Sequence, residues 1–509
     1  MSNAVHIVDL FSGPGGLGEG FSSCRDENDH VAYQIQVSIE KEQSAHKTLR
    51  LRSFLRKFDV FPEEYYAWIG GKTQEPDWKH LYPEQWHAAD DEALCMELGK
   101  PETTTFLNKR IEEINKEANG RTLLIGGPPC QAYSLVGRSR RAGIEDYKPQ
   151  KDERNFLYRE YCKVLNTLKP AVFVMENVKG MLSSSIKGKA IFEQVLDDLE
   201  KAGDGYRLLA LSGKGNLLDR PDPRDFVIHA EDYGVPQARH RVIIVGVKRE
   251  LATRLPKDLF DFTLVKNKRQ TTAEEVLHGL PCLRSGLSRK DNPDHWLEVV
   301  TTAANTLQEI SAVYPGKNRK AYLAILKRMA STLSQTAVKG RMSTGRTGFS
   351  RDLNERLKQF LDDNRLVGVS GHETRGHMAS DLARYMYVAC FAEAEGSSPR
   401  AKQFPEQLAP AHKNWHSGKF NDRFRVQVGT GPSTTVTSHI SKDGHYFIHP
   451  DANQCRSLTV REAARLQTFP DNYHFMGNRT QQFVQVGNAV PPFLARQIAE
   501  LLLPVFQFI

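Results

Sequence analysis

Short runs of consecutive apolar residues recur along the first half of the chain and alternate with segments of helical periodicity. The runs predict strands at residues 4–11, 33–39, 123–126, 171–175, 206–211 and 241–247. Helical periodicity predicts helices between them, at residues 44–57, 155–168 and 189–201. Continuous apolar strands separated by helices are typical of an α/β fold with a doubly wound, mostly parallel sheet.

This α/β rhythm also predicts how the chain divides. It fades after Lys248, so we expect residues 1–247 to form a catalytic and cofactor-binding domain and residues 248–453 a second, smaller one. Residues 454–509 contain two further helical patterns and are expected to return to the first domain. The aromatic, proline-dotted stretch 58–101 interrupts the rhythm and is expected to be an insertion.

Composition narrows the class of protein only a little. Hydrophobic residues make up 39% of the 509 positions and charged residues 26%, which is ordinary for a globular protein. We expect no signal peptide and no membrane span, because no apolar run approaches the length of about 18 residues that a span needs. The seven cysteines form no CxxC pair, which favours a reducing, cytoplasmic location.

One histidine pair was considered as a metal site. His372 and His377 flank a glutamate, but the zinc-protease motif places its histidines four residues apart on one helix face. These two are five apart, so no metal site is predicted.

A glycine-rich turn follows the first predicted strand. Gly13, Gly15 and Gly18 have the GxGxxG spacing that lets a cofactor approach backbone amides at the start of a helix. Glu40 ends the next strand, at the distance where an acid meets ribose hydroxyls. The pattern predicts a nucleotide-type cofactor, and it fits both NAD and S-adenosylmethionine.

Two residues beside this turn help to separate those cofactors. Asp9 lies within the end of the strand and Phe11 at the start of the turn. An acid and an aromatic ring at these positions suit a cationic, adenine-bearing ligand without a pyrophosphate. Core packing is an equally good explanation for Phe11.

A cysteine follows the strand at 123–126. The apolar run ends in two glycines and two prolines before Cys130, so its thiol is rigidly presented at the carboxyl edge of the sheet, where ligands bind in such folds. Cys282 also follows a proline but has no strand or glycines before it. A buried structural thiol is the ordinary role for either cysteine, and the nucleophilic role of Cys130 depends on its neighbours.

Charged residues follow two later strands. Glu176 directly follows the strand at 171–175, and Arg239 and Arg241 precede and open the strand at 241–247. Two arginines two residues apart point to the same side of an extended chain and suit an anion or a polarised carbonyl.

The net charge of +8 is unevenly distributed. Residues 301–350 carry eight Lys or Arg side chains and one acid, Glu309, which indicates a polyanion-binding surface as readily as a solvated helix face. The basic, glycine-flanked stretch 137–143 has the composition of a mobile phosphate-facing loop.

Together these segments resemble the cytosine-5 DNA methyltransferases. The resemblance covers roughly residues 4–40, 122–247 and 433–500 and rests on six motifs in the family's order: Asp9-Leu-Phe-Ser-Gly-Pro-Gly-Gly16, Gly127-Pro-Pro-Cys-Gln131, Glu176-Asn-Val178, Gln237-x-Arg239-x-Arg241, Arg461-Glu-x-x-Arg465-Leu-Gln-x-Phe-Pro470 and Gln485-Val-Gly-Asn488. It implies the S-adenosylmethionine-dependent methyltransferase fold, with residues 248–453 as a target-recognition domain.

The resemblance also implies a mechanism and a set of site residues. Cys130 would attack carbon 6 of a flipped-out cytosine, a protonated Glu176 would contact N3, and Arg239 and Arg241 would lie near the base carbonyl and the thiol. Residues implied around S-adenosylmethionine are Asp9, Phe11, Gly13, Gly15, Gly16, Glu40, Pro128 and Asn488. The implied partner is double-stranded DNA, bound by a monomer that acts separately from any cognate restriction endonuclease.

One position departs from the family pattern. The family usually carries an acid about twenty residues before the cysteine to meet the adenine amine, and here Asn108 lies at about that distance. Three alternatives stay open from the sequence: an RNA cytosine methyltransferase, a silent nucleic-acid-binding relative and a nicotinamide oxidoreductase.

Overall fold

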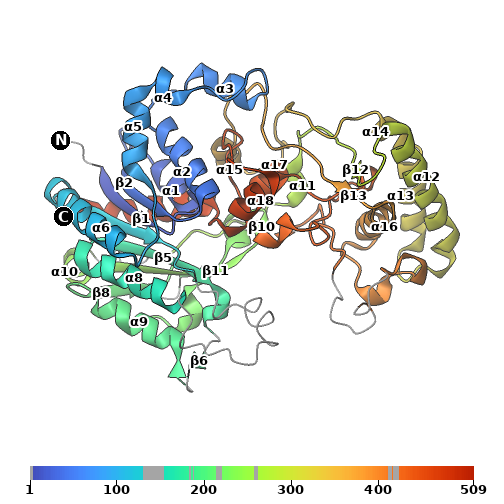
Figure 1. Cartoon of the computed structure of the whole chain (residues 1–509). Coiled ribbons are helices and arrows are strands. Elements are labelled where there is room, and N and C mark those ends of the chain that lie inside the picture. Colours follow the sequence, from blue (N-terminus) through green and yellow to red (C-terminus); the bar gives the residue numbers. More distant parts are fainter. Residues whose placement is uncertain are drawn as a thin grey trace.

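The computed structural model contains one large sheet flanked by helices and a second, mainly helical lobe (Figure 1). It describes residues 4–129, 154–182, 185–186, 189–213, 220–256, 259, 262–410, 415 and 423–509. Cys130 and the basic stretch 137–143 lie outside the described residues.

The large sheet has eight strands. Seven run in the order β3-β2-β1-β4-β5-β11-β8, and β9 pairs with β11. Their bounds are β1 Val5–Leu10, β2 Tyr33–Glu40, β3 Ala93–Cys95, β4 Thr122–Gly126, β5 Val172–Val178, β8 Tyr206–Leu209, β9 Val227–His229 and β11 His240–Lys248. The first five strands are parallel to their neighbours, and β11 is antiparallel to β5, β8 and β9. The predicted doubly wound, mostly parallel sheet is confirmed.

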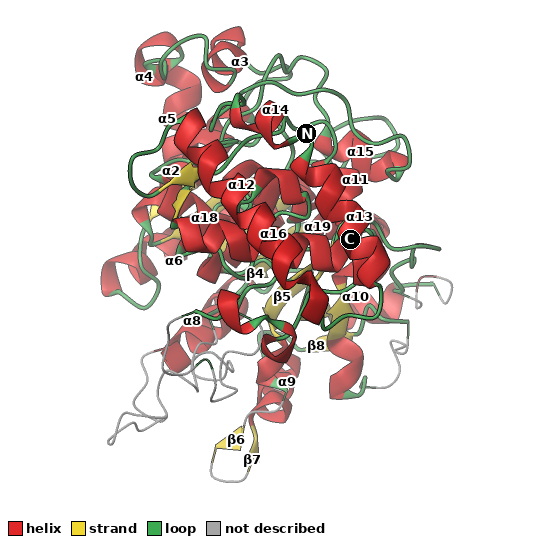
Figure 2. Cartoon of the chain, turned by 90° about the vertical axis from the view of Figure 1, so that its right-hand side faces the viewer, coloured by secondary structure: helices red, strands yellow, loops and turns green. Residues whose placement is uncertain are grey.

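Helices cover both faces of the sheet (Figures 1 and 2). The helices α1 (Gly16–Ser22), α10 (Arg249–Arg254) and α19 (Pro492–Leu502) share one apolar core with the strands. A second core lies on the opposite face, beneath α6 (Pro101–Glu117), α8 (Arg154–Leu168) and α9 (Ile191–Lys201). Because both faces are buried, the central strands are continuously apolar, as the sequence pattern required.

The stretch 58–101 is only partly an insertion. Its helices α3 (Glu63–Ile69), α4 (Trp78–Leu81) and α5 (Pro83–Glu92) pack an aromatic core against α2 (Gln43–Leu55). Residues 93–95 are the edge strand β3, which pairs with β2. Three residues are too few for periodicity to reveal a strand.

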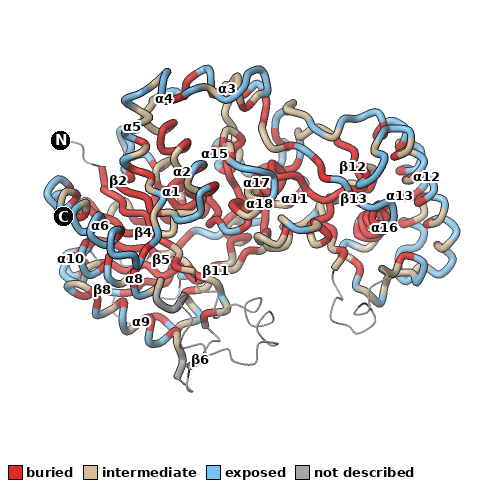
Figure 3. Tube along the Cα trace, viewed as in Figure 1, coloured by how far each residue is buried: buried red, intermediate tan, exposed pale blue. Residues whose placement is uncertain are grey.

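The second lobe is built around the buried helix α16 (Ala379–Glu395), which Figure 3 shows almost wholly in red. Around it pack α12 (Pro293–Glu309), α13 (Arg319–Ala330) and α14 (Leu333–Ala337), and their shared core runs from residue 287 to residue 455. The remaining elements of this region are α11 (Ala273–Leu277), β12 (Gly286–Leu287), α15 (Glu355–Leu361), β13 (Gly376–His377) and β14 (Ser433–Thr434).

The C-terminal segment returns to the first lobe. Helix α17 (Val460–Leu466) follows a capping box at Thr459, since Thr459 and Glu462 exchange side-chain to backbone hydrogen bonds. After α18 (Arg479–Asn488), α19 packs directly against α1 at the other end of the chain. The apolar stretch Arg479–Phe508 has the length and hydropathy of a membrane span, but 72% of its most apolar window is buried inside the protein. Packing on the sheet accounts for its apolar character.

The contact between α1 and α19 gives a first prediction. A Cβ atom at Gly20 would overlap Ala495 and the carbonyl of Pro492. Gly20→Ala should therefore lower the free energy of unfolding by about 1–3 kcal/mol, despite a gain of about 1 kcal/mol in helix propensity. Urea unfolding followed by circular dichroism measures the change. Gly431→Ala is the control, because no atom lies within 4 Å of its added Cβ; unchanged stability of Gly20→Ala would contradict the packing.

Candidate active site

The turn after β1 leaves one side open. Gly13 and Gly15 have φ angles of +56° and +96°, which glycine adopts without the cost of a side chain. No atom of the described residues lies within 4 Å of the position that a Cβ of Gly13 would take, whereas one at Gly16 would overlap the carbonyl of Val490. Gly13 thus faces free space and Gly16 faces the C-terminal segment. The open side is where a cofactor can approach the backbone.

Phe11 carries backbone strain at the start of this turn. Its φ angle of +55° is unusual for a residue with a side chain. The ring is partly buried against the core beneath α6, α8 and α9. Strain of this kind, which costs of order 1–3 kcal/mol, often accompanies a ligand site. This position is compatible with both roles expected for Phe11, a cofactor contact and core packing.

Asp9 is a buried carboxyl group at the end of β1, beside Ser12. It is 1% exposed, and neither carboxyl oxygen has a hydrogen-bond partner among the described residues. Burial raises the pKa of Asp9 to about 8. A buried acid left in this state fits a site that receives a positively charged ligand.

Glu40 closes the other side of the turn. Its carboxylate accepts hydrogen bonds from the backbone amides of Gly13 and Glu42, both at 2.8 Å. Burial raises the pKa of Glu40 above its usual value. The carboxylate therefore fixes the glycine turn and remains at the carboxyl end of β2.

Glu176 and Arg241 face each other across two neighbouring strands. The Nε atom of Arg241 lies 2.8 Å from Oε1 of Glu176, and the side chains are 15% and 13% exposed. Strands β5 and β11 are antiparallel here, with Glu176 opposite Ile243 and Arg241 opposite Val178. The sequence predicted that both residues lie at one edge of the sheet, and the structure joins them in an ion pair.

The backbone that leads to Cys130 is tied to the same place. The Nδ2 atom of Asn177 donates a hydrogen bond to the carbonyl of Pro128 at 3.1 Å. A Cβ at Gly127 would lie 3.0 Å from Oε2 of Glu176, so the absence of a side chain lets the carboxylate approach. Cys130 follows two residues later, beyond the described segment.

Arg239 has different surroundings from Arg241. It is 1% exposed and donates hydrogen bonds to the carbonyls of Val436, Gly487 and Ala489. Burial lowers the pKa of its guanidinium well below the usual value. Arg239 lies between β10 (Gln237–Ala238) and β11, and it is close enough to Arg241 and Glu176 for both charges to act on its pKa. Arg239 holds the C-terminal segment in place.

That segment also brings Asn488 toward the glycine turn. Asn488 is exposed at the end of α18, and the following residue, Ala489, lies against Gly16. The hydroxyl of Tyr473 donates a hydrogen bond to the carbonyl of Pro14. The last fifty residues thus form one wall of the open turn.

Asn108, the position considered for the adenine contact, lies elsewhere. It is exposed in the middle of α6, whose buried face is formed by Leu107, Ile111 and Ile114. Glu97 lies two residues after β3 and pairs with Lys41 at 3.3 Å, while the amide of Met96 donates to the carbonyl of Glu40. Glu97 is therefore one of the acids beside the ends of β2 and β3.

The arginine motif before the C-terminus is structural. Arg465 pairs with Asp471 at 2.7 Å and donates to the carbonyls of Val276 and His278. Arg456 pairs with Glu462 at 2.6 Å, and Glu462 also caps α17. These fully buried pairs connect the second lobe to the C-terminal helices. Charge alone could not reveal this role, since the same residues would suit phosphate binding.

Part of the basic run is also neutralised within the protein. Arg328 pairs with Glu393, Arg341 with Asp291, and Arg346 with Asp362 and Asp471. The candidate polyanion surface of this run is therefore narrower than its composition indicated.

The two histidines of the rejected zinc motif are both buried. His372 forms hydrogen bonds with Thr459 and the carbonyl of Pro281, and His377 forms hydrogen bonds with Tyr385 and Ser457.

The sheet, the open glycine turn and the acid–arginine pair define an α/β enzyme of the methyltransferase class. The chain belongs to the C-5 cytosine-specific DNA methylase family, whose sequence profile matches residues 100–503. It is a DNA (cytosine-5-)-methyltransferase, in agreement with the resemblance found in its motifs.

Individual relatives extend this finding over nearly the whole chain. The type II methyltransferase M.Bpa9945I of Bacillus paralicheniformis is 32% identical over 97% of both chains. The type II methyltransferase M.AgeI of Thalassovita gelatinovora is 26% identical over 97% of this chain and 98% of its own. Among solved structures, a chain described as a DNA modification methyltransferase encoded within an E. coli prophage is 19% identical, with a TM-score of 0.54 over 99% of this chain and all of its own, which shows a shared fold.

Asp9 generates a prediction on pH dependence. The folded protein keeps the Asp9 proton up to about pH 8, whereas the unfolded chain releases it near pH 3.8. The stability that this proton contributes is complete at low pH and is lost as the pH rises toward 8. Between pH 5.5 and 8 the free energy of unfolding should therefore fall more steeply for the native protein than for Asp9→Asn, by about 3 kcal/mol over the range.

Urea unfolding at several pH values in that range, without added cofactor, measures both slopes. Asp26→Asn is the control, because Asp26 is exposed to solvent and its pKa is lowered, so that it titrates below the range. Parallel profiles for native protein and Asp9→Asn would rule out a buried, protonated Asp9.

Proposed function

We propose that this enzyme transfers the methyl group of S-adenosylmethionine to carbon 5 of a flipped-out cytosine in double-stranded DNA, at a specific sequence. The observation that carries the proposal is the Glu176–Arg241 pair beside the Asn177–Pro128 contact. It puts an acid, a cation and the backbone leading to Cys130 at one edge of the sheet, next to the open glycine turn. S-adenosylmethionine, when bound, supplies an electrophilic methyl group.

Cys130 is the proposed nucleophile. The chain has seven cysteines, and in each of the six described ones burial raises the thiol pKa. None of these six is therefore an activated thiolate. Addition of the Cys130 thiolate to carbon 6 of cytosine makes carbon 5 nucleophilic. After methyl transfer, a base removes the carbon 5 proton and Cys130 leaves from carbon 6.

Glu176 and Arg241 are proposed to act on the cytosine ring. Glu176 takes up a proton as the base enters and donates a hydrogen bond to N3, which relieves the charge that thiolate addition creates. Arg241 holds Glu176 in place and offers its remaining N–H groups to the base carbonyl. Gly127 keeps the space before the carboxylate clear.

The open turn is the proposed cofactor site. Gly13, Gly15 and Gly16 let the backbone approach the ligand. The carboxyl group of Asp9 would attract the positively charged cofactor, and the ring of Phe11 would pack against it. Glu40 lies where the ribose would bind, and Pro128 and Asn488 border the same space. We assign the adenine contact to Glu97 in place of Asn108.

The second lobe is the proposed DNA-reading part, within the target-recognition domain at residues 248–453. Lys317, Lys320, Lys327 and Lys339 are the lysines of the basic run that would meet phosphates. We propose a cytoplasmic monomer that acts separately from any cognate restriction endonuclease. The naming of its relatives as type II methyltransferases supports the restriction-modification context.

The central prediction concerns Cys130. Cys130→Ala should reduce methyl transfer by about 10⁴-fold or more, because the nucleophile is lost, while binding of S-adenosylmethionine stays near normal. The measurement is base-resolution methylation sequencing of a plasmid propagated with the protein in a methylation-free host. Cys282→Ala is the matched control and should keep full activity. Turnover in Cys130→Ala would refute the mechanism, and methylated RNA with unmodified DNA would favour the RNA substrate.

A second prediction tests Glu97. Glu97→Gln should weaken binding of S-adenosylmethionine by about tenfold or more, since a charge-assisted hydrogen bond is replaced by a neutral one. Isothermal titration calorimetry on the full chain measures it. Glu102→Gln, on the exposed first turn of α6, should bind the cofactor normally. Equal affinity in both variants would remove Glu97 from the site.

A further inference from the structure

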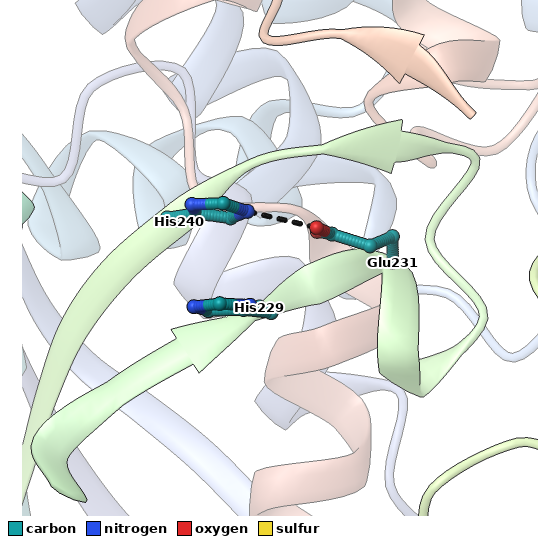
Figure 4. Close-up of side chains that lie close together, drawn as sticks. All are labelled: His229, Glu231 and His240. Carbon is teal, nitrogen blue, oxygen red and sulfur yellow. Dashed lines mark hydrogen bonds and ion pairs between the residues drawn. The ribbon is translucent and has the colours of Figure 1, made fainter.

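A second cluster of coordinating side chains lies beside the methyl-transfer site and has no role in it. His229 ends β9 and His240 begins β11, directly opposite each other in the antiparallel pairing. Glu231 lies in the first turn of the short helix η4 (Ala230–Tyr233) that follows β9. The three side chains gather at this corner of the sheet (Figure 4), and their candidate ligand atoms all lie within 4.8 Å of one another.

The geometry within the cluster is defined. The two imidazole rings are stacked, with centroids 3.9 Å apart and planes 9° from parallel. The Nε2 atom of His240 lies 2.8 Å from Oε1 of Glu231. Glu231 is only 8% exposed. Its second carboxylate oxygen, Oε2, is buried and has no hydrogen-bond partner among the described residues.

This arrangement leaves Oε2 of Glu231 without a hydrogen-bond partner among the described residues. A buried carboxylate oxygen without a partner costs free energy, and a cation beside it removes that cost. Two imidazole nitrogens and one carboxylate oxygen are the ligand set of zinc sites that keep a further position for water. His229 and His240 are partly exposed, so an ion and its waters have access.

We propose that His229, Glu231 and His240 bind one divalent transition-metal ion, with Zn²⁺ as the best match and water completing its coordination. At zinc–ligand distances of about 2.0–2.2 Å the ligand atoms must approach one another to about 3.4 Å. The rings must also tilt away from parallel, which side-chain rotation at a strand end and a strand start allows. The ion takes the place of the proton on Nε2 of His240, and the neutral ring then carries its proton on Nδ1, so that Nε2 and the Glu231 carboxylate both face the metal.

Charges of both signs surround the cluster. Lys179 lowers the pKa of His229 and Asp232 raises it. Asp232 is already paired with Lys266 at 3.0 Å, so it is not a fourth ligand in this conformation. The metal would link the end of β9 to the start of β11, at the base of the turn that carries Arg239. Ion binding therefore fixes the start of β11, where the next residue, Arg241, meets Glu176 on the opposite face of the strand.

The test uses the full chain without an affinity tag, stripped with a chelator and dialysed. Calorimetric titration with ZnCl₂ should give one saturable site, and the midpoint of thermal unfolding should rise with the ion. Substitution with Co²⁺ should give the visible absorption of a low-coordinate site. His229→Ala, His240→Ala and Glu231→Gln should each weaken Zn²⁺ binding by at least about tenfold.

Controls separate this site from surface binding. His295→Ala removes an exposed histidine that pairs with Glu298 on α12 and should leave Zn²⁺ binding unchanged. If His240→Ala does not fold, as judged by circular dichroism, Glu231→Gln decides through the Co²⁺ spectrum, which should change when the carboxylate is lost. Absence of a saturable site, or equal affinity in the native protein and all three variants, would overturn the proposal. Neither readout requires methyl transfer, so failure of the proposed catalytic mechanism would not affect it.

Discussion

The active-site edge depends on the packing of the C-terminal helices against the glycine-rich start of the chain. Gly16 and Gly20 lie so close to Val490, Pro492 and Ala495 that a methyl group at either position would overlap them. The turn after β1 is consequently fixed from both sides, by Glu40 through Gly13 and by Tyr473 through Pro14. A cofactor site made from the first forty residues cannot be complete until the last fifty have folded onto it.

Buried arginines carry that dependence into the second lobe. Arg239 binds carbonyls at residues 436, 487 and 489, and Arg465 binds carbonyls at residues 276 and 278. A guanidinium can satisfy several carbonyls in one plane, which suits segments that meet without regular secondary structure. Removing one such arginine would leave several buried acceptors unpaired. The family motifs therefore contain residues that stabilise the fold as well as residues that we propose to act on the substrate.

The sequence predicted the mostly parallel sheet, because its strands depend on local pattern. Strand ends follow from apolar runs that stop at glycine, proline or charge, and parallel strands bring those ends to one edge. Three features could not be predicted from local pattern because they depend on distant partners. The role of Arg239 depends on carbonyls some 200 residues away, the short strand β3 depends on pairing with β2, and the charge of residues 301–350 depends on the acids that Arg328, Arg341 and Arg346 meet. Cofactor contacts and the state of Cys130 remain predictions.

Neighbouring residues at the start of β11 show how strictly register divides these roles. Side chains alternate between the faces of a strand, so Arg241 meets Glu176 on one face while His240 meets Glu231 on the other. A slip of one residue in the pairing of β11 with β5 would exchange the two and leave Glu176 facing an imidazole. Gly246 opposes that slip, because a Cβ atom at its position would lie 2.1 Å from the ring of Phe173 on β5, so neither neighbouring valine can take its place. The same register that buries the core therefore keeps the proposed metal ligands and the proposed catalytic pair apart.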